Sequence, residues 1–315
     1  MGVHFVTRAF LAGLAVALTA SALFRSRPPV RGRHREPAIR PDHLVVGDGV
    51  RLPLATWLPE GPPEAVMLGV HAYGDYRQAF GLLGPWFAAR GIAVYAYDQR
   101  GFGESPSRGE WPGADALVHD LQDGVVALRR HHPGLPVVVA GESMGGAVAL
   151  TGLGRATIEG VDALIVAAPG VRGNMPLRQV HDVALKLAAL ALPWLAVELR
   201  RGGRPWLDPG EARRLADDPL ILRAISVGTY DGLIELATLA SETPKNALPP
   251  TLVLHGALDR TVPRRAIDDL MPRLGEGALL RAYPDRPHLL CHEHAVEHVF
   301  ADCLAWLTGG QGLGG

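Results

Sequence analysis

Short apolar runs alternate with longer segments of helical spacing from about residue 43 to residue 307. The apolar runs predict eight strands, at residues 43–46, 50–57, 65–71, 92–97, 136–141, 161–167, 250–255 and 278–283. Several of these runs consist almost entirely of apolar residues, which is typical of strands covered on both faces by helices. The pattern therefore favours a sheet buried between two layers of helices.

The segments between those runs have the spacing of amphipathic helices. They lie at residues 76–90, 114–132, 144–155, 264–274 and 293–307. Strands that alternate with helices in this way form a mostly parallel sheet with right-handed crossovers. We predict an α/β fold with a mostly parallel, eight-stranded sheet and helices on both faces.

Residues 170–249 interrupt the alternation with about 80 residues of mainly helical pattern. At the centre of this stretch, residues 183–199 are apolar almost all round, apart from Lys186, and are broken at Pro193. One interpretation is a pair of core helices packed on the sheet. The other, favoured by the position directly after a strand, is an inserted helical cap whose apolar inner face covers a pocket. A cap of this kind implies an apolar substrate.

The amino-terminal region differs from the rest of the chain. Residues 9–24 contain no charged side chain and are flanked by arginines. They are slightly short of the ~20 residues that span a bilayer, but long enough for a signal peptide. The sequence Ala20-Ser21-Ala22 suits cleavage and export, whereas the basic cluster behind it favours retention. We predict an uncleaved membrane anchor whose side is undecided, with a signal peptide or a buried helix as alternatives.

These patterns divide the chain into three parts. Residues 1–41 form the apolar segment and a linker rich in arginine and proline that should not pack. Residues 42–309 form the α/β domain, and residues 310–315 form a flexible tail.

Composition and charge exclude several classes of partner. Hydrophobic residues make up 48% and charged residues 20% of the chain, as in globular proteins. Seven of the 31 basic residues but only one of the 32 acidic residues precede Pro41, so residues 41–315 carry a net charge of −7. A mildly acidic body without a basic stripe offers no binding surface for nucleic acid. We therefore expect a small-molecule partner, and the sequence does not predict an oligomeric state.

The cysteines give no sign of a metal site or a disulfide. Cys291 and Cys303 are the two cysteines, and neither a CxxC motif nor a Cys/His zinc spacing occurs. Within one predicted helix they would lie roughly 18 Å apart, too far to pair. We predict no metal and no cofactor.

The segment Gly141-Glu142-Ser143-Met144-Gly145 has the pattern G-x-S-x-G between a predicted strand and a predicted helix. In that context the serine occupies a sharp, strained turn that projects its hydroxyl above the sheet. The glycines allow the strand and the helix to approach closely. Ser143 is therefore the predicted nucleophile.

A nucleophilic serine needs a histidine base and an acid that orients it, in the order Ser, Asp, His on this scaffold. Asp259 follows the strand after the insertion and is the predicted acid. His288 follows the last strand and is the predicted base. Three other histidines near the carboxyl end of the chain, assigned to a strand or to the final helix, are expected not to reach the turn around Ser143 easily: His255, His292 and His294.

Two backbone N–H groups should stabilise the oxyanion that forms on attack. One should come from Met144, directly after the nucleophile. The other should come from the loop after the strand at 65–71, most naturally from Tyr73. His71, at the end of that strand, is interpreted as a structural histidine rather than a base.

From about residue 44 to residue 307 the sequence resembles an α/β-hydrolase of the monoacylglycerol lipase and lysophospholipase group, also described as serine aminopeptidase-like hydrolases. The segments that carry this resemblance are HAYGDYRQAFG, YAYDQRGFGES, GESMGG, HGALDRTVP and YPDRPHLLCHE. It implies the α/β-hydrolase fold with a helical cap, the triad Ser143, Asp259 and His288, and oxyanion donors at Tyr73 and Met144. It also implies hydrolysis of a fatty acyl ester without a cofactor.

The sequence departs from the pattern of this group at two positions. Ala72 replaces a usual glycine in the oxyanion loop, and Glu142 replaces the usual histidine beside the nucleophile. A carboxylate at position 142 is expected to raise the pKa of the catalytic histidine or to disfavour anionic headgroups.

Three functions remain open from the sequence. The favoured one is a serine hydrolase that cleaves a lipid ester such as a monoacylglycerol or a lysophospholipid. The second is a related carboxylesterase or aminopeptidase-like hydrolase with a different acyl substrate. The third is a non-catalytic, membrane-tethered binding protein.

Overall fold

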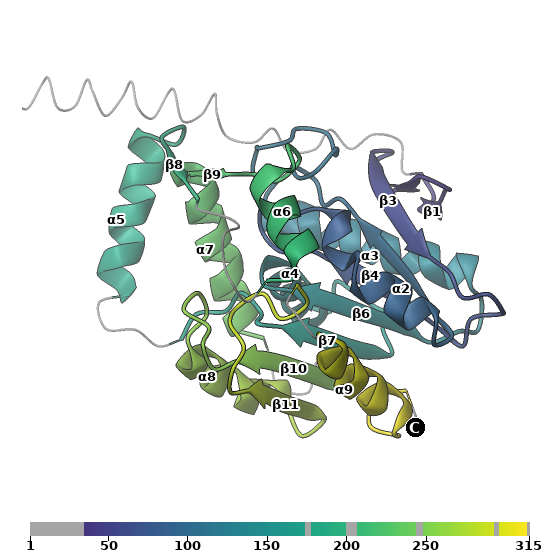
Figure 1. Ribbon diagram of the computed structural model, residues 1–315. Helices are drawn as coiled ribbons and strands as arrows, with labels where there is room; N and C mark the ends of the chain where they lie inside the picture. The colour runs from purple at the N-terminus through teal and green to yellow at the C-terminus, as the bar shows by residue number, and fades with distance from the viewer. Residues whose placement is uncertain (1–34, 174–177, 200–206, 244–247, 293–295, 314–315) are drawn as a thin grey trace, which may run out of the picture.

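The computed structural model describes residues 35–173, 178–199, 207–243, 248–292 and 296–313. Within them, nine strands form one sheet with the order β1-β2-β3-β5-β4-β6-β7-β10-β11 (Figure 1). The strands are β1 (Ala38–Ile39), β2 (His43–Val45), β3 (Arg51–Trp57), β4 (Ala65–Val70), β5 (Ile92–Tyr97), β6 (Val137–Glu142), β7 (Ala163–Ala167), β10 (Thr251–Gly256) and β11 (Ala278–Tyr283). Strands β1, β2, β3 and β5 pair antiparallel, and all pairings from β5 to β11 are parallel.

The mostly parallel α/β sheet agrees with the prediction, but it has nine strands rather than eight. The additional strand, β1, lies in the segment that was predicted to be an unpacked linker. Ala38 pairs with Val45, the backbone N–H of Arg35 donates to the carbonyl of Gly47 at 2.8 Å, and Glu36 forms an ion pair with Arg130. The expectation that residues 35–41 would not pack is therefore wrong, because backbone pairing holds a strand too short to have a hydrophobic pattern.

Helices cover both faces of the sheet, and the central strands are buried accordingly. One face packs against α3 (Ala114–His131), α4 (Met144–Gly154) and α8 (Arg264–Leu274). The other packs against the 3₁₀ turn η1 (Arg77–Phe80), α2 (Leu83–Ala88) and α9 (Glu297–Thr308). This arrangement leaves the carboxyl ends of the parallel strands as the edge where loops can form a site.

Between β7 and β10 the chain leaves the sheet and forms an insertion. Its elements are α5 (Arg178–Ala191), β8 (Ala196–Glu198), α6 (Pro209–Asp217), β9 (Ala224–Ser226) and α7 (Val227–Ser241). β8 and β9 pair antiparallel, and α7 packs on α4. The insertion is therefore joined to the sheet through the helix that follows the predicted nucleophile.

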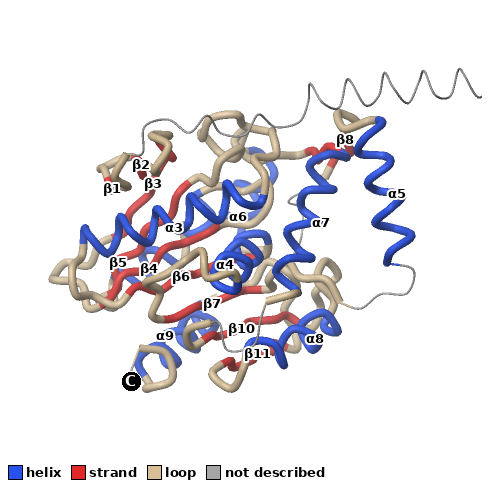
Figure 2. The backbone as a smooth tube through the Cα atoms, turned by 180° about the vertical axis from the view of Figure 1, so that it is seen from behind, coloured by secondary structure: helices blue, strands red, loops and turns tan. Residues whose placement is uncertain are grey.

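Helix α5 stands away from the sheet beside α7 in both views of the backbone (Figures 1 and 2). The prediction that residues 183–199 cover a pocket with an apolar inner face differs from what is observed. The side chains of Val183, Leu187 and Trp194 are 60%, 59% and 58% exposed. The helix ends at Ala191, because Pro193 cannot continue it. Helix α5 contacts α7 along one side and presents its remaining apolar residues to the surface.

The structure can be compared with only part of what is predicted for the two ends of the chain. The apolar segment at residues 9–24 lies outside the described residues, and no helix among those described is long and apolar enough to cross a membrane. At the other end, the backbone N–H of Leu313 donates to the carbonyl of Leu307 at 2.9 Å, and its side chain packs against the core. The part of the expected tail that is described therefore folds back onto α9.

Candidate active site

Ser143 lies in a sharp turn between the end of β6 and the start of α4. Its backbone has φ 50° and ψ −110°, a strained conformation for a residue with a side chain. Two hydrogen bonds hold this turn: the N–H of Ser143 donates to Ala167 at 2.9 Å, and its carbonyl accepts from the N–H of Gly170 at 2.8 Å. The turn therefore presents the hydroxyl at the carboxyl edge of the sheet.

Gly145 is required by the close approach of α4 to β4. A Cβ atom at position 145 would collide with the backbone carbonyl of Val70. Because that carbonyl belongs to a central strand, it cannot move aside without disturbing the sheet.

We expect Gly145→Ala to push α4 and Ser143 out of place. Overpacking of this kind costs about 1–3 kcal/mol, and a displacement of ~1 Å at a reacting group costs ~10²-fold in rate. Thermal unfolding and steady-state hydrolysis of a soluble ester measure both effects. Gly61→Ala is the matched control, because a Cβ atom there meets no atom within 4 Å. Equal activity of the two variants would contradict the steric role of Gly145.

The structure brings Ser143, His288 and Asp259 together in one chain of hydrogen bonds. His288 Nε2 lies 2.9 Å from Ser143 Oγ, and His288 Nδ1 lies 2.7 Å from Asp259 Oδ2. When the imidazole carries its proton on Nδ1, this N–H donates a hydrogen bond to the Asp259 carboxylate, and Nε2 accepts a hydrogen bond from the serine hydroxyl. Their loops follow β6, β10 and β11, whose parallel carboxyl ends meet at one edge of the sheet.

Asp259 is buried but well hydrogen bonded. Its second oxygen, Oδ1, accepts from the backbone N–H groups of Thr261 at 2.7 Å and Val262 at 3.0 Å. Burial raises the pKa of Asp259, but the hydrogen bond and charge of His288 and these backbone donors outweigh it, so the pKa is lowered overall. The carboxylate is therefore ionised at neutral pH and is suited to orient an imidazole and to stabilise its charged form.

Tyr73 lies on the loop after β4, and Met144 is the first residue of α4. β4 and β6 pair in parallel, with Val70 opposite Gly141, so the loop after β4 lies beside the start of α4. The Tyr73 hydroxyl donates to the carbonyl of Ala224 in the insertion at 3.2 Å. The two predicted oxyanion donors therefore belong to neighbouring segments, the loop after β4 and the start of α4.

The two residues before Tyr73 fit the loop without strain. Ala72 does not have a positive φ, so its methyl group adds no backbone strain where glycine is usual. His71 is fully buried, with Nδ1 2.8 Å from the carbonyl of Ala72 and Nε2 accepting from the N–H of Gln99 at 3.0 Å. These contacts fit the structural role predicted for His71.

The prediction that His292 lies in the final helix and does not easily reach the turn around Ser143 is wrong. His292 lies in a turn before α9 rather than in the helix, and it is fully buried. Its Nε2 lies 2.7 Å from Oε2 of Glu142, which directly precedes Ser143, and its Nδ1 lies 2.7 Å from Oε2 of Glu211 on α6. Of the other two histidines, His255 contacts the carbonyl of Val262 at 3.0 Å, and His294 lies outside the described residues.

The same cluster continues from Glu211 through Arg214 to Asp75. Arg214 donates to both oxygens of Asp75, at 2.6 and 3.0 Å, and to Glu211 at 2.8 Å. Sequence reasoning missed these three residues, because they match no motif and because Asp75 lies more than a hundred positions before Glu211 and Arg214. The one available signal was the unusual glutamate at position 142.

His292 carries a proton at neutral pH. Burial alone lowers its pKa, but the charges and hydrogen bonds of Glu142 and then Glu211 outweigh it and raise the pKa to about 10. The pKa of Glu211 is lowered in return, against the effect of its burial, chiefly by the hydrogen bond to His292. The histidine is thus an imidazolium held between two carboxylates.

Because the pKa of His292 is raised in the folded protein, the free energy of unfolding should fall as the pH rises. The contribution of His292 is fully present below its ordinary pKa of 6.5 and is lost as the pH rises through about 10. Urea unfolding at several pH values in this range should give a free energy of unfolding that falls more steeply for the wild type than for His292→Gln. The difference in slope should be roughly 1 kcal/mol per pH unit. Parallel slopes would show that His292 is not charged in the folded protein.

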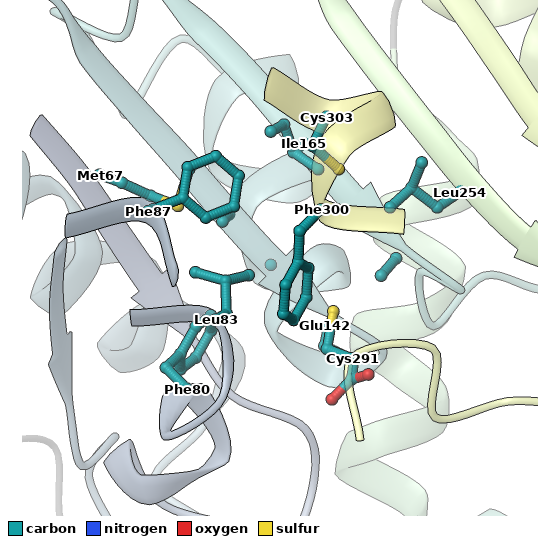
Figure 3. A pocket seen from close by; sticks show the side chains of 13 residues that line it. Met67, Phe80, Leu83, Phe87, Glu142, Ile165, Leu254, Cys291, Phe300 and Cys303 are labelled. Carbon is teal, nitrogen blue, oxygen red and sulfur yellow. The ribbon is translucent and has the colours of Figure 1, made fainter. Parts of the chain in front are cut away.

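A small apolar cavity lies between β6 and helices α2 and α9, next to Glu142 at the end of β6 (Figure 3). Glu142 and Cys291 lie at one end of it, and Cys303 also lines it. The expectation that the two cysteines occupy one helix is wrong, because Cys291 precedes α9. The cavity measures about 20 Å³, too small for an acyl chain, so it belongs to the core rather than to a substrate site.

A mostly parallel sheet, with a strained serine at a strand-to-helix turn and a helical insertion after β7, defines an α/β-hydrolase. Residues 61–295 match the family described as serine aminopeptidase, S33, and the chain belongs to this family of serine hydrolases.

Proteins with similar sequences include two lipases. A monoacylglycerol lipase of Mycolicibacterium smegmatis is 27% identical over 273 residues, which cover 85% of this chain and 97% of that one. The human monoglyceride lipase is 29% identical over 276 residues, covering 84% and 89% of the two chains.

Solved structures share the fold. The monoacylglycerol lipase of Paleococcus ferrophilus superposes with a TM-score of 0.67 at 18% identity, over 82% of this chain and 98% of that chain. A soluble variant of the monoglyceride lipase of Saccharomyces cerevisiae gives a TM-score of 0.69 at 19% identity, over 83% and 92% of the two chains.

Proposed function

We propose that this protein cleaves the carboxylic ester of a lipid with a single acyl chain, such as a monoacylglycerol or a lysophospholipid, through an acyl-enzyme on Ser143. The observation that carries the proposal is the hydrogen-bonded chain from Ser143 through His288 to Asp259 at the strained turn. The lipases among its relatives support the substrate class.

In the first half of the proposed reaction, His288 Nε2 takes the proton of the Ser143 hydroxyl as Oγ attacks the ester carbonyl carbon. The carbonyl oxygen becomes an oxyanion, which the N–H groups of Tyr73 and Met144 stabilise. Asp259 stabilises the imidazolium formed on His288. The bond from the carbonyl carbon to the alcohol oxygen then breaks, and His288 returns its proton to the departing alcohol.

In the second half, His288 removes a proton from a water molecule that attacks the acyl group on Ser143. The bond between the acyl carbon and Oγ breaks, His288 returns the proton to Oγ, and the fatty acid leaves. Every proton in this scheme passes through one imidazole, and every other group is a side chain or backbone amide of this chain, so the proposal uses no cofactor.

We also propose that the insertion at about residues 170–249 acts as a cap on the domain formed by residues 42–309. Its second half lies against the loop that carries Tyr73. Leu222 donates its backbone N–H to the carbonyl of Gly74 at 2.9 Å, and Tyr76 donates its hydroxyl to Asp218 at 2.5 Å. These two contacts with the segment after β4 support the role of the insertion as a cap.

A substrate panel tests the proposal. The purified protein should hydrolyse monoacylglycerols or lysophospholipids with a kcat/KM well above that for aminoacyl amides, and Ser143→Ala should abolish this activity. Preference for short esters or for aminoacyl amides would support a different acyl substrate. Failure of the wild type to hydrolyse any ester, or to react with a fluorophosphonate, would support the non-catalytic alternative.

For the apolar segment at residues 9–24 we propose a membrane anchor, with a cleaved export signal as the alternative. Its lack of charge and the arginines on either side support this role. The residues proposed for catalysis all lie within the described part of the chain, downstream of this segment.

We expect removal of residues 1–34 to leave kcat on a soluble ester unchanged and to lower sedimentation with membranes. Removal of residues 1–40 should in addition lower the melting temperature, because it deletes β1 and the ion pair between Glu36 and Arg130. Thermal unfolding of the two truncated proteins, with the same ester assay, measures the difference. Loss of kcat on removing residues 1–34 would contradict a role limited to attachment.

A further inference from the structure

Two histidines from the same turn contact two consecutive residues of the nucleophile turn. His288 Nε2 lies 2.9 Å from Ser143, and His292 Nε2 lies 2.7 Å from Glu142. The backbone between them forms a tight turn, since the N–H of Leu290 donates to the carbonyl of His288 and the N–H of His292 donates to the carbonyl of Leu289. The loop that carries the proposed base is therefore fixed to β6 at two points.

His292 also joins this loop to the insertion. Its Nδ1 lies 2.7 Å from Glu211 on α6, and its carbonyl accepts from the N–H of Asp208, the residue that caps α6, at 3.0 Å. Glu211 in turn binds Arg214, which holds both oxygens of Asp75 on the loop after β4. We call these five side chains the buried ion network: Glu142, His292, Glu211, Arg214 and Asp75.

Every charged group of the buried ion network has a partner of opposite charge when the network is complete. It contains three carboxylates and two cations, and all three carboxylates are less than 10% exposed. One oxygen of Glu142, Oε1, is buried and has no hydrogen-bond partner among the described residues, so His292 is the cation that compensates this carboxylate. Removing His292 would leave the buried carboxylate of Glu142 without a cation, which is strongly destabilising for that local arrangement.

We propose that His292 is a positioning residue of the esterase site, which fixes the loop of His288 against the nucleophile turn and makes that alignment depend on the seating of α6. The proposal rests on the proposed function of Ser143 and His288. The network ends on the loop that carries Tyr73, so the same side chains hold the base, the nucleophile turn and an oxyanion donor in one arrangement. Alignment of this kind contributes to catalysis because small displacements of reacting groups cost large factors in rate.

The charge on His292 is the feature that an experiment can follow. The groups that face it are Glu142 from β6 and Glu211 from α6, with Arg214 and Asp75 beyond them. If His292 must be protonated for alignment, activity should fall on the alkaline side as His292 loses its proton. Replacing either neighbouring carboxylate by its amide should move this loss to lower pH.

The test compares kcat/KM for p-nitrophenyl butyrate, with spontaneous hydrolysis subtracted, from neutral pH through the region of the His292 pKa. The variants are Glu142→Gln, Glu211→Gln and the double variant, with rates divided by the fraction of sites that react with a fluorophosphonate. Asp120→Asn is the matched control, because it removes a buried carboxylate paired with Arg100 outside the network.

We expect each single variant to lose roughly 10-fold or more in kcat/KM and to shift the alkaline loss down by at least about one pH unit. The double variant should lose less than the product of the two single losses, since the two glutamates interact only through His292. Asp120→Asn should leave the pH profile unchanged.

Two results would overturn the proposal: an unshifted alkaline limb in both single variants, or losses that multiply independently. A shift of the same size in Asp120→Asn would overturn it as well, because a general loss of stability would then explain the profile. These failures are distinct from failure of the proposed function, in which the wild type would show neither ester hydrolysis nor reaction of Ser143 with the fluorophosphonate.

Discussion

Replacing Ser143 or His288 by alanine should lower kcat for ester hydrolysis by at least ~10³-fold, with the fold retained. In the proposed reaction no acyl-enzyme forms without Ser143, and without His288 the hydroxyl at 2.9 Å loses the group proposed to accept its proton. The two losses should not multiply in the double variant, because the residues act as a unit. Steady-state kinetics on a soluble ester, with thermal unfolding as a check of folding, measures these effects.

The control for this experiment must be a histidine outside the site. His119→Ala is suitable, because His119 lies exposed on α3. His292→Ala is not, because His292 is buried against the residue that precedes the nucleophile. Asp259→Asn should cost somewhat less than the loss of the base, since it removes the orienting charge but leaves the imidazole. Activity of His288→Ala close to that of His119→Ala would show that another group is the base.

The second large effect is expected in the dependence of activity on acyl-chain length. Each methylene group moved from water into an apolar environment contributes about 0.8 kcal/mol, close to a fourfold gain in kcat/KM. The proposed substrate carries a long acyl chain that must be bound away from water, and exposed apolar side chains of the insertion, such as Val183 and Leu187 on α5, are candidates for contacting it. Octanoate and palmitate esters should therefore exceed acetate esters by one to several orders of magnitude.

Measurement of kcat/KM for acetate, butyrate, octanoate and palmitate esters of one alcohol checks this dependence, with each ester kept below the concentration at which it forms micelles. A profile that is flat, or that is highest for acetate, would contradict the lipid-ester proposal and favour a small-ester hydrolase.

Much of the fold could be predicted because the strands that build it are buried on both faces. Runs such as residues 137–141 and 252–254 are apolar throughout, and such runs have few structural alternatives between helical segments. β1 could not be predicted, since two residues among prolines and arginines have no periodicity and are held by backbone pairing alone.

The parts of the site that were predicted are those with local signatures. Ser143 lies in a motif that specifies its own strand-to-helix turn. Asp259 and His288 each follow an apolar run that predicts a parallel strand, and the carboxyl ends of parallel strands lie at one edge of a sheet. The buried ion network has no such signature. Glu211 meets His292 because α6 of the insertion lies against the turn before α9, and no pattern near either residue indicates that contact.

Helix α5 shows that a local pattern can predict an element without predicting its surroundings. Its apolar pattern correctly predicts a helix, but the pattern does not tell whether the apolar side faces a pocket or the surface. Leu187 and Trp194 are more than half exposed, because α7 covers only one side of the segment. Which side of a helix is covered depends on its neighbours, and the neighbours depend on the path of the whole insertion.

The central claim is that Ser143 forms the acyl-enzyme, and mass spectrometry after reaction with a fluorophosphonate tests it most directly. The wild type should gain one phosphonyl group on the peptide that contains Ser143, and excess monoacylglycerol should slow the reaction. His288→Ala should react at least ~10³-fold more slowly. Absence of the adduct, or an adduct on another residue together with ester hydrolysis that survives Ser143→Ala, would contradict the claim.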